Sequence, residues 1–206
     1  MCRSSVFCVI LLALSACTSV RDLSSRPHPD VFGMQAWQVH QASLESLQTW
    51  SLKGRVAGKS NNEGFQAGVR WVQNPLTFSI DLHGPLGRKT AVLSGMTGQV
   101  QLSTSRGEHY FADDPEILMQ NLLGYALPVA GLQYWVRGIP DPDEKVLLLE
   151  LDAKGRLLHL RQAGWDIDYN RYHEGQPALP ALVEISSPTL YAKIIVDRWY
   201  LDATLN

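Results

Sequence analysis

A long series of short segments in which apolar and polar residues alternate constrains this chain most. The alternation begins at Ser51 and recurs along most of the following 150 residues or so, which is typical of half-buried strands. Strands are expected at about 51–57, 65–72, 77–82, 89–96, 99–104, 108–112, 145–152, 156–163, 165–172, 181–187 and 190–200. Short connections make sequential strands antiparallel neighbours, so the pattern predicts a meander of about eleven strands.

So many antiparallel strands in one domain must either divide into two sheets or curl until fewer edges stay exposed. A curled sheet has one concave face, and the period of two assigns every second residue to it. The side chains expected on that face are Leu52, Val56, Val69, Trp71, Phe78, Ile80, Leu82, Leu93, Leu102, Leu148, Ile167, Ile185, Ile194 and Val196. A half-barrel of this kind either fills itself or holds something apolar.

Three predicted helices, at 34–50, 114–124 and 131–137, are available to cover the concave face. The first has an apolar stripe at helical spacing. The second opens with acidic residues and a proline, which are favoured in a first helical turn. Leu118, Leu122 and Trp135 of the second and third helices are expected to line the same apolar space as the strands.

The first 17 residues have the pattern of an export signal that ends on a cysteine. Arg3 supplies a positive charge, Val6–Leu14 an apolar run, and small residues precede Cys17. A transmembrane helix needs ~20 apolar residues, so this run is too short to be one. A plain secretory signal also explains 1–16, but it needs no cysteine at the cleavage point. The pattern resembles the lipobox of bacterial lipoproteins, in which the cysteine carries diacylglycerol on sulfur and an acyl chain on its new N-terminus.

The chain thus divides into a signal peptide (1–16), a lipidated tether (17–30) and one folded domain (31–206). The tether is polar, with two prolines and no periodicity. Thr18, rather than aspartate, follows Cys17, which by resemblance to known sorting behaviour indicates the outer membrane. The domain itself has no cysteine, so we expect packing rather than disulfides to stabilise it.

Motifs for catalysis and metal binding are sparse. The six histidines occur singly, and neither Gly-x-Ser-x-Gly nor His-Glu-x-x-His is present. The pairs Asp113/Asp114 and Asp166/Asp168 are interpreted as a helix cap and one face of a strand, with an acidic dyad as the open alternative. The net charge of −2 gives no basic surface for nucleic acid. We expect no enzymatic activity, no metal, no cofactor other than the covalent lipid, and no nucleic-acid partner.

The connection after the strand 77–82 places a leucine between glycines. In His83-Gly-Pro-Leu-Gly-Arg-Lys, Leu86 falls near the tip of a turn and Arg88 and Lys89 follow it. An apolar tip beside two positive charges suits insertion at an anionic membrane surface. The alternative is an ordinary hairpin whose Leu86 folds back onto the core.

Several motifs together resemble the LolB family of outer-membrane lipoprotein receptors, although no single motif is specific. Besides the lipobox they are Trp37-x-x-His40, Leu82-x-Gly-Pro-Leu-Gly87, Ala112-Asp-Asp-Pro-Glu116, Leu127-Pro-Val129, Leu132-x-x-Trp-Val-x-Gly-Ile-Pro140 and Pro177-Ala-Leu-Pro180. They cover essentially the whole mature chain in order.

The resemblance implies an unclosed, curved antiparallel β-barrel with three lid helices over a hydrophobic cavity, a mainly β member of the α+β class. It implies a lipid-anchored outer-membrane protein facing the periplasm, which accepts lipoproteins from the loaded periplasmic carrier LolA and inserts them into the outer membrane. Leu86 matches the leucine that assists delivery in that family. The expected partners are the carrier, acyl chains and outer-membrane lipids, and we expect a monomer.

Two alternatives belong to other functional classes. A scaffolding envelope lipoprotein would have the same anchor and β domain but a filled core. An esterase or transglycosylase-like lipoprotein would need clustered catalytic groups, and the sequence offers no such cluster.

Overall fold

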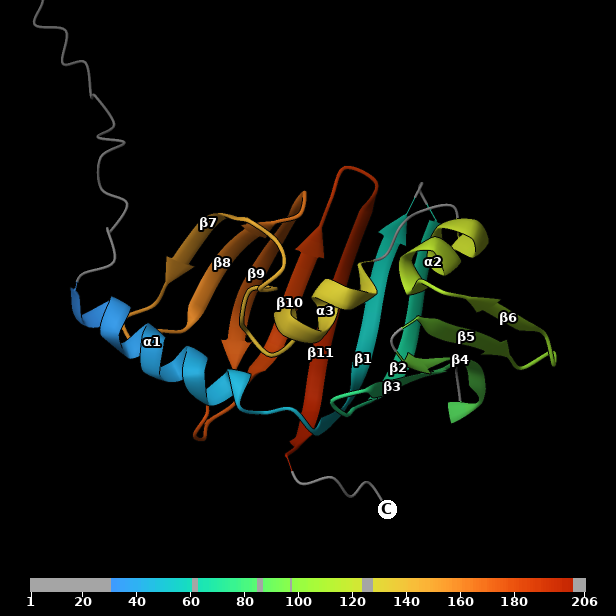
Figure 1. The fold of residues 1–206 in the computed structure, drawn as a ribbon, viewed down its shortest axis with the longest axis horizontal. Coiled ribbons are helices and arrows are strands. Elements are labelled where there is room, and N and C mark those ends of the chain that lie inside the picture. Colours follow the sequence, from blue (N-terminus) through green and yellow to red (C-terminus); the bar gives the residue numbers. More distant parts are fainter. Residues whose placement is uncertain (1–30, 61–62, 85–86, 97, 124–127, 202–206) are drawn as a thin grey trace, which may run out of the picture.

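One continuous antiparallel sheet dominates the computed structural model, which describes residues 31–60, 63–84, 87–96, 98–123 and 128–201 (Figure 1). Within these residues its eleven strands are β1 (Trp50–Ser60), β2 (Glu63–Gln73), β3 (Thr77–His83), β4 (Lys89–Met96), β5 (Gln99–Thr104), β6 (His109–Ala112), β7 (Val146–Leu151), β8 (Leu157–Gln162), β9 (Trp165–Tyr172), β10 (Pro180–Ser186) and β11 (Leu190–Tyr200). The predicted signal peptide, tether, Cys17 and Leu86 lie outside the described residues.

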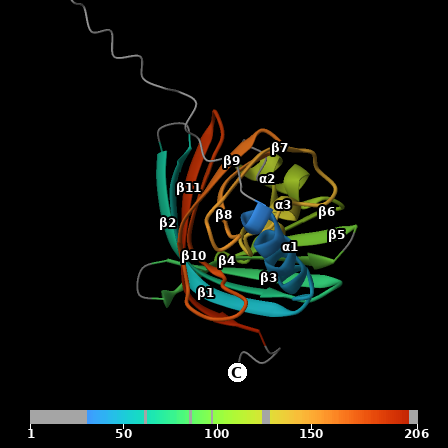
Figure 2. The same ribbon diagram turned by 90° about the vertical axis from the view of Figure 1, so that its left-hand side faces the viewer.

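The order of the strands is that of two meanders joined at one seam. The sheet runs β6-β5-β4-β3-β2-β1-β11-β10-β9-β8-β7, so the first six strands meet the last five where β1 pairs with β11. The strands β6 and β7 are its two edges, and they do not pair with each other. The sheet is therefore curled but unclosed, as Figure 2 shows from one end, with the helices inside the curve.

Tight turns enforce the antiparallel pairing. Between β8 and β9, Gln162 pairs with Trp165 and only two residues form the turn. Ala163 and Gly164 have φ of 52° and 79°, which is the backbone that a two-residue hairpin turn requires. At the seam, the register shifts between Lys53 and Gly54, and such a bulge bends the strands locally.

Three helices cover parts of the concave face: α1 (Val31–Glu45), α2 (Pro115–Leu123) and α3 (Val129–Trp135). Figures 1 and 2 show α1 beside the β7–β9 end of the sheet and α2 above the β4–β6 end, with α3 between them. The helix α1 lies so close to the β7–β8 turn that a Cβ on Gly155 would come within 2.3 Å of the Trp37 amide nitrogen. Glycine is the residue that permits this approach.

The strand and helix pattern predicted from the sequence is confirmed, but one helix is shorter than expected. The first helix, predicted over 34–50, ends at Glu45. Trp50 instead begins β1 and packs against Trp71 and Trp199, at 5.2 and 5.4 Å between ring centroids. Burial of three indole rings overrides the helical periodicity that extends to Leu47.

Leu148 is misplaced by the simple alternation rule. It lies opposite Arg161 in the β7–β8 register, whereas Leu149 and Leu151 pack against the core. The β7–β8 register shifts between Val146 and Leu148 and again between Glu150 and Leu151. The alternation of inward and outward side chains is therefore interrupted within β7. The prediction of Leu148 on the concave face is therefore wrong.

Candidate functional site

The predicted concave-face residues are brought together by the strand register. One transverse row crosses six strands, from β1 to β6, as Leu52, Trp71, Ile80, Leu93, Leu102 and Tyr110. A second, nearer the β3–β4 loop, contains Val196, Gly54, Val69, Leu82 and Ala91. A third contains Val183, Ile194, Val56 and Ala67. The concave face is thus apolar over most of the sheet's width.

Side chains of the protein itself fill part of this face. Around α1 and α3, a large buried cluster contains Leu52, Trp135, Ile167, Ile185 and Val196. A smaller cluster joins Leu118 and Met119 of α2 to Leu93 and Val100 of the sheet. These clusters account for the buried members of the predicted set; Leu122 lies in α2, but its side chain is outside the described part of the structure.

Between the clusters and the β3–β4 loop the concave face is only half covered. Val56, Val69, Leu82 and Ile194 are half-buried, and Val56 and Leu82 belong to neither cluster. The positions beside them are small, namely Gly54, Gly58, Ala67, Ala91 and Ala192. We call this stretch, Val56, Val69, Leu82 and Ile194 with its small neighbours, the apolar trough.

A separate hollow lies at the opposite end of the same strands. Its volume is about 280 Å³, and Trp71 and Phe78 of the predicted set line it together with Val129 and Gln133 of α3. Leu76, at the β2–β3 turn, lies on its rim and is highly exposed. Apolar surface of the sheet is thus reachable from both ends of the strands.

Buried hydrogen bonds fasten α3 to the far half of the sheet. The Trp135 indole Nε1 donates to Gln162 Oε1 at 2.8 Å, and the Tyr169 hydroxyl donates to the Trp135 carbonyl at 2.9 Å. Gln162 is fully buried, and its Nε2 donates to the carbonyls of Asp141 and Glu144 at 2.8 Å. Burial raises the pKa of Tyr169 well above its usual value, so this hydroxyl stays a donor. A shift of α3 would break several of these bonds.

Arg137 fastens the same region to α1. Its Nη1 donates to the carbonyls of Leu44 and Leu47, each at 3.0 Å, and its guanidinium lies 5.2 Å from the centroid of the Tyr134 ring. These carbonyls end α1, where a cation is favourable. Burial lowers the pKa of Arg137, and the two carbonyls compensate for some of the lost hydration.

The helix α2 is attached more loosely. Asp114 caps it by accepting hydrogen bonds from the amides of Glu116 and Ile117 at 2.7 and 3.0 Å. Among its described side chains, Leu118 and Met119 are buried, the Glu116 carboxyl accepts a hydrogen bond from the Ala130 backbone of α3, and Ile117 is 58% exposed. Burial, followed by the nearby Asp114, raises the pKa of Glu116. Of α2 and α3, α2 has fewer buried hydrogen bonds among the described residues.

The loop that contains Leu86 is described on both sides of its tip. The Gly84 amide donates to the Arg88 carbonyl at 2.8 Å, and Gly87 has φ of 71°. Lys89 Nζ lies 3.0 Å from Asp81 Oδ2, whereas Arg88 is exposed. The ends of the trough strands lead directly into this loop, because Leu82 is followed by His83 and the turn.

His109 and His159 each lie beside polar or acidic side chains on the outer face of the sheet. His109 Nδ1 lies 3.0 Å from Ser103 Oγ, but also 3.0 Å from Gln101 Nε2, on an exposed strand pair. His159 lies between Asp166 and Asp168 on the outer face, as cross-strand pairs. Over the same residues no cluster of potential metal ligands occurs, and no helix is long and apolar enough to cross a membrane.

Sequence reasoning missed Gln162, Arg137 and Asp141. Each is polar and buried, and each has at least one partner more than 20 residues away along the chain, so periodicity gives no signal for it. Gln162 directly precedes the tight turn at Ala163 and Gly164, where a polar residue looks like ordinary turn composition.

An unclosed antiparallel half-barrel with an apolar concave face and helices across its mouth defines a class of proteins suited to holding hydrophobic ligands. A solved structure of this kind is the putative outer membrane lipoprotein-sorting protein domain from Vibrio parahaemolyticus. It matches with a TM-score of 0.50 at 8% identity, over 84% of this chain and 94% of that one. The likeness concerns the fold.

Sequence comparison then gives the family. A family model for the outer membrane lipoprotein LolB matches residues 48–199. The Outer-membrane lipoprotein LolB of Nitrosococcus oceani is 35% identical over 97% of this chain and 98% of its own length. The protein of that name from Pseudomonas aeruginosa is 37% identical over 80% of each chain. The chain belongs to the LolB family of outer-membrane lipoproteins.

Proposed function

We propose that this protein receives lipoproteins by their acyl chains from a periplasmic carrier of the LolA kind and releases them into the outer membrane. The observation that supports this most directly is the apolar trough, a stretch of apolar concave face that the protein's own clusters leave half covered. In a protein with no need for a ligand, such a stretch would be covered or polar.

Burial of methylene groups provides the driving force. Each exposed CH₂ costs ~0.8 kcal/mol in water, so acyl chains of a lipoprotein must stay covered throughout the handover. Apolar side chains give non-directional burial that depends on the lipid and not on the attached protein. Transfer then runs downhill, from the carrier to this protein and on to the bilayer, and it needs no covalent step, metal or cofactor.

Structure and sequence suggest which part moves. The α3 region is held by the Trp135, Gln162 and Arg137 hydrogen bonds, so we propose that α2 alone is displaced when acyl chains enter. Leu118 of α2 would then exchange its contacts with the sheet for contacts with the chains, and Leu122 is proposed to contact the chains as well. Of the three helices expected to form the lid, this proposal moves only α2.

The remaining predicted residues have roles at the membrane. Cys17 carries the diacylglycerol and N-acyl anchor that keeps the protein, as a monomer, on the periplasmic side of the outer membrane. Leu86 enters the membrane's inner leaflet, and Arg88 and Lys89 meet phosphate head groups. The short path from Leu82 to this loop puts the end of the trough next to the point of insertion.

The decisive experiment measures acceptance of a labelled lipoprotein from its complex with the carrier. The mature chain with Cys17→Ala is used as a water-soluble acceptor, and Leu82→Asp is compared with Leu158→Asp. Leu158 is exposed on β8, outside both core clusters, so it is a matched control for the added charge. We expect acceptance to fall at least tenfold for Leu82→Asp only, since an aspartate in the trough opposes burial of acyl chains.

The same experiment addresses the scaffold alternative. A scaffold with a filled core would accept no lipoprotein with or without the substitution, and saturable acceptance that is equal in both variants would contradict the trough as the binding surface. Membership in the LolB family does not favour the scaffold.

A further inference from the structure

Three cations lie directly opposite one another on the outer face of the sheet. In the register, Arg198 of β11 pairs with Lys53 of β1, and Lys53 pairs with Arg70 of β2. Their neighbours Leu52 and Trp71 are buried in the core, so the three charges point to the other side. Directly opposite positions on adjacent strands are ~5 Å apart, and like charges there destabilise a sheet. We call Arg198, Lys53 and Arg70 the cation row.

The structure does little to neutralise this row. Asp81 is the next residue across from Arg70, but it is engaged by Lys89 at 3.0 Å. Asp197, next to Arg198, is engaged by Arg55 at 2.9 Å. Among the described residues, the row itself has no ion pair, and its one short-range partner is the Tyr200 ring, 5.5 Å from Lys53 Nζ.

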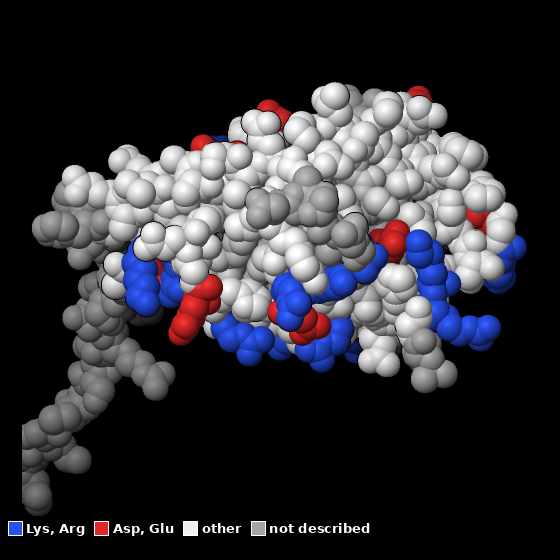
Figure 3. Space-filling model, turned by 90° about the horizontal axis from the view of Figure 1, so that it is seen from below, with Lys and Arg blue, Asp and Glu red and all other residues white. Residues whose placement is uncertain are grey.

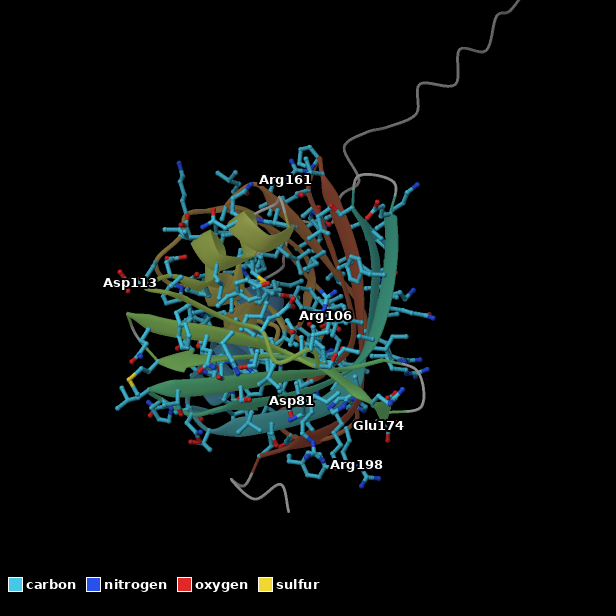
Figure 4. The ribbon with its side chains drawn as sticks, turned by 90° about the vertical axis from the view of Figure 1, so that its right-hand side faces the viewer. Asp81, Arg106, Asp113, Arg161, Glu174 and Arg198 are labelled. Carbon is cyan, nitrogen blue, oxygen red and sulfur yellow. The ribbon has the colours of Figure 1, made fainter. Side chains whose placement is uncertain are left out.

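More cations surround the row on the same face. Figure 3 shows Lys and Arg side chains gathered on the sheet side of the molecule when it is seen from below. Figure 4 places Arg198 and Asp81 on that side and Asp113 on the opposite, helix-bearing side. The next row of the register crosses four strands, from Arg55 of β1 through Gly68 of β2 and His83 of β3 to Lys89 of β4. The same face therefore carries further cations as far as Lys89, although Arg55 and Lys89 are each paired with a carboxylate.

We infer that this outer face of β11, β1 and β2 docks onto an anionic phospholipid surface, with the cation row as its centre. A sheet that keeps three opposed cations loses stability that neutral residues would recover, and an anionic partner in contact with the row offsets that loss. Head-group phosphates at a bilayer surface supply many negative charges with no fixed geometry, which suits a flat row of flexible lysine and arginine side chains.

A membrane fits this surface better than an acidic protein does. Protein interfaces have an apolar centre, whereas the centre of this surface is a row of three cations. Continuity with the 83–89 loop also puts the row beside the predicted point of insertion. The inference rests on the proposed function only for the identity of the bilayer, the outer membrane's inner leaflet.

The test is binding of the Cys17→Ala mature chain to vesicles of phosphatidylethanolamine with or without phosphatidylglycerol. The row variant carries Lys53→Gln, Arg70→Gln and Arg198→Gln, and the control carries Lys145→Gln, Lys154→Gln and Arg106→Gln, three exposed cations elsewhere. At ~1 kcal/mol per basic residue near an anionic surface, the row variant should bind the anionic vesicles roughly a hundredfold more weakly. The control should lose much less, and the wild-type preference should fade with added salt.

Thermal unfolding separates this result from simple loss of structure. Because the row opposes like charges, the row variant should unfold at the wild-type temperature or above it. Equal vesicle binding by both triple variants overturns the inference, and so does a row variant that binds vesicles normally but no longer binds the loaded carrier, since that marks a protein-docking face. Acceptance of lipoprotein is measured separately, so failure of membrane docking and failure of the proposed function are distinguishable.

Discussion

Gln162 joins α3 and the 141–144 segment to β8 through four hydrogen bonds. Its amide group joins the Trp135 indole, the Asp141 amide and the carbonyls of Asp141 and Glu144, all within 2.9 Å. Burying a side-chain amide costs free energy, and the four hydrogen bonds of Gln162 offset that cost. Without this amide, each partner left unpaired costs about 1–3 kcal/mol.

We therefore predict that Gln162→Leu lowers the free energy of unfolding by about 3 kcal/mol or more, with urea unfolding followed by tryptophan fluorescence as the measurement. The matched control is Gln66→Leu, at an exposed position of β2, and it should change stability by less than about 0.5 kcal/mol. A similar loss in both variants would show that the network around Trp135 contributes nothing specific.

Asp152 gives the fold a defined response to acid. Burial alone would raise the pKa of Asp152, but hydrogen bonds from the Arg156 backbone and side chain and from the Lys154 amide lower it below its ordinary value of 3.8. A carboxyl whose pKa is lowered by folding stabilises the protein above its unfolded pKa, and this contribution disappears as the pH falls through the folded pKa. The Arg156 guanidinium also lies 4.6 Å from the centroid of the Tyr172 ring.

The corresponding prediction concerns the difference between wild type and Asp152→Asn. The variant should be less stable at pH 7, and the difference should shrink steadily below pH 4, because both proteins then have a neutral group at 152. Denaturant unfolding at several pH values measures this difference. Asp113→Asn, at an exposed position, is the control. If the stability difference between wild type and Asp152→Asn stayed constant down to pH 2, titration of Asp152 would not contribute to stability.

At the scale of elements, α2 and α3 differ in how they are held. The helix α3 is joined by buried hydrogen bonds to β8 and β9, and Arg137, just after it, bonds to the end of α1. Among its described side chains, α2 has the Asp114 cap, the Glu116 bond to Ala130, and two buried residues, Leu118 and Met119. Local opening free energies follow the number of buried contacts, so the amides of α2 should exchange with solvent faster than those of α3.

Hydrogen exchange followed by mass spectrometry tests this in the mature chain. Asp114→Ala should speed exchange in α2 by about fivefold, since loss of an N-cap costs about 1 kcal/mol, and it should leave α3 unchanged. Asp113→Ala serves as the neighbouring control, because the two helical amides bond to Asp114 instead. If the two helices exchange at the same rate in the wild type, α2 is not the movable part.

The elements also show how far sequence alone reaches. Alternation locates the strands and puts Leu52, Trp71 and Ile80 on one face, because hydrophobic burial has the period of the strand. It fails at Leu148, since three consecutive leucines in β7 carry no period and bulges change the parity. It also fails where long-range contacts decide, as at Trp50, whose aromatic neighbours come from β2 and β11.

At the scale of the whole molecule, the two faces of one sheet differ in chemistry. The concave face is apolar and partly covered by helices, and the outer face has cations opposed across the seam of β1 and β11. The loop at 83–89 lies where the apolar trough and the basic surface both end. One end of the strands can thus combine the proposed contact with lipid head groups and the proposed release of acyl chains.

This arrangement predicts separable effects of the loop and the trough. Leu86→Glu should leave acceptance of lipoprotein from the carrier intact but abolish its release into liposomes, because the charged tip no longer enters the bilayer. Transfer assays with and without liposomes measure the two steps. Leu86→Ile is the control that keeps the apolar tip, and normal release by Leu86→Glu would count against a role in delivery.

The proposed lipid anchor at Cys17 would bring both proposed steps to one membrane. Three acyl chains hold a protein at a bilayer stably, whereas a single chain binds only marginally. Replacement of the lipoprotein signal by a plain secretory signal, with Cys17→Ala, should therefore leave lipoprotein binding unchanged and reduce the preference of delivery for the outer membrane. A reconstituted assay that offers the carrier complex both inner- and outer-membrane vesicles measures that preference. Because the trough and the 83–89 loop are intact in this variant, an unchanged preference would mean that selectivity comes from the domain itself and not from the lipid on Cys17.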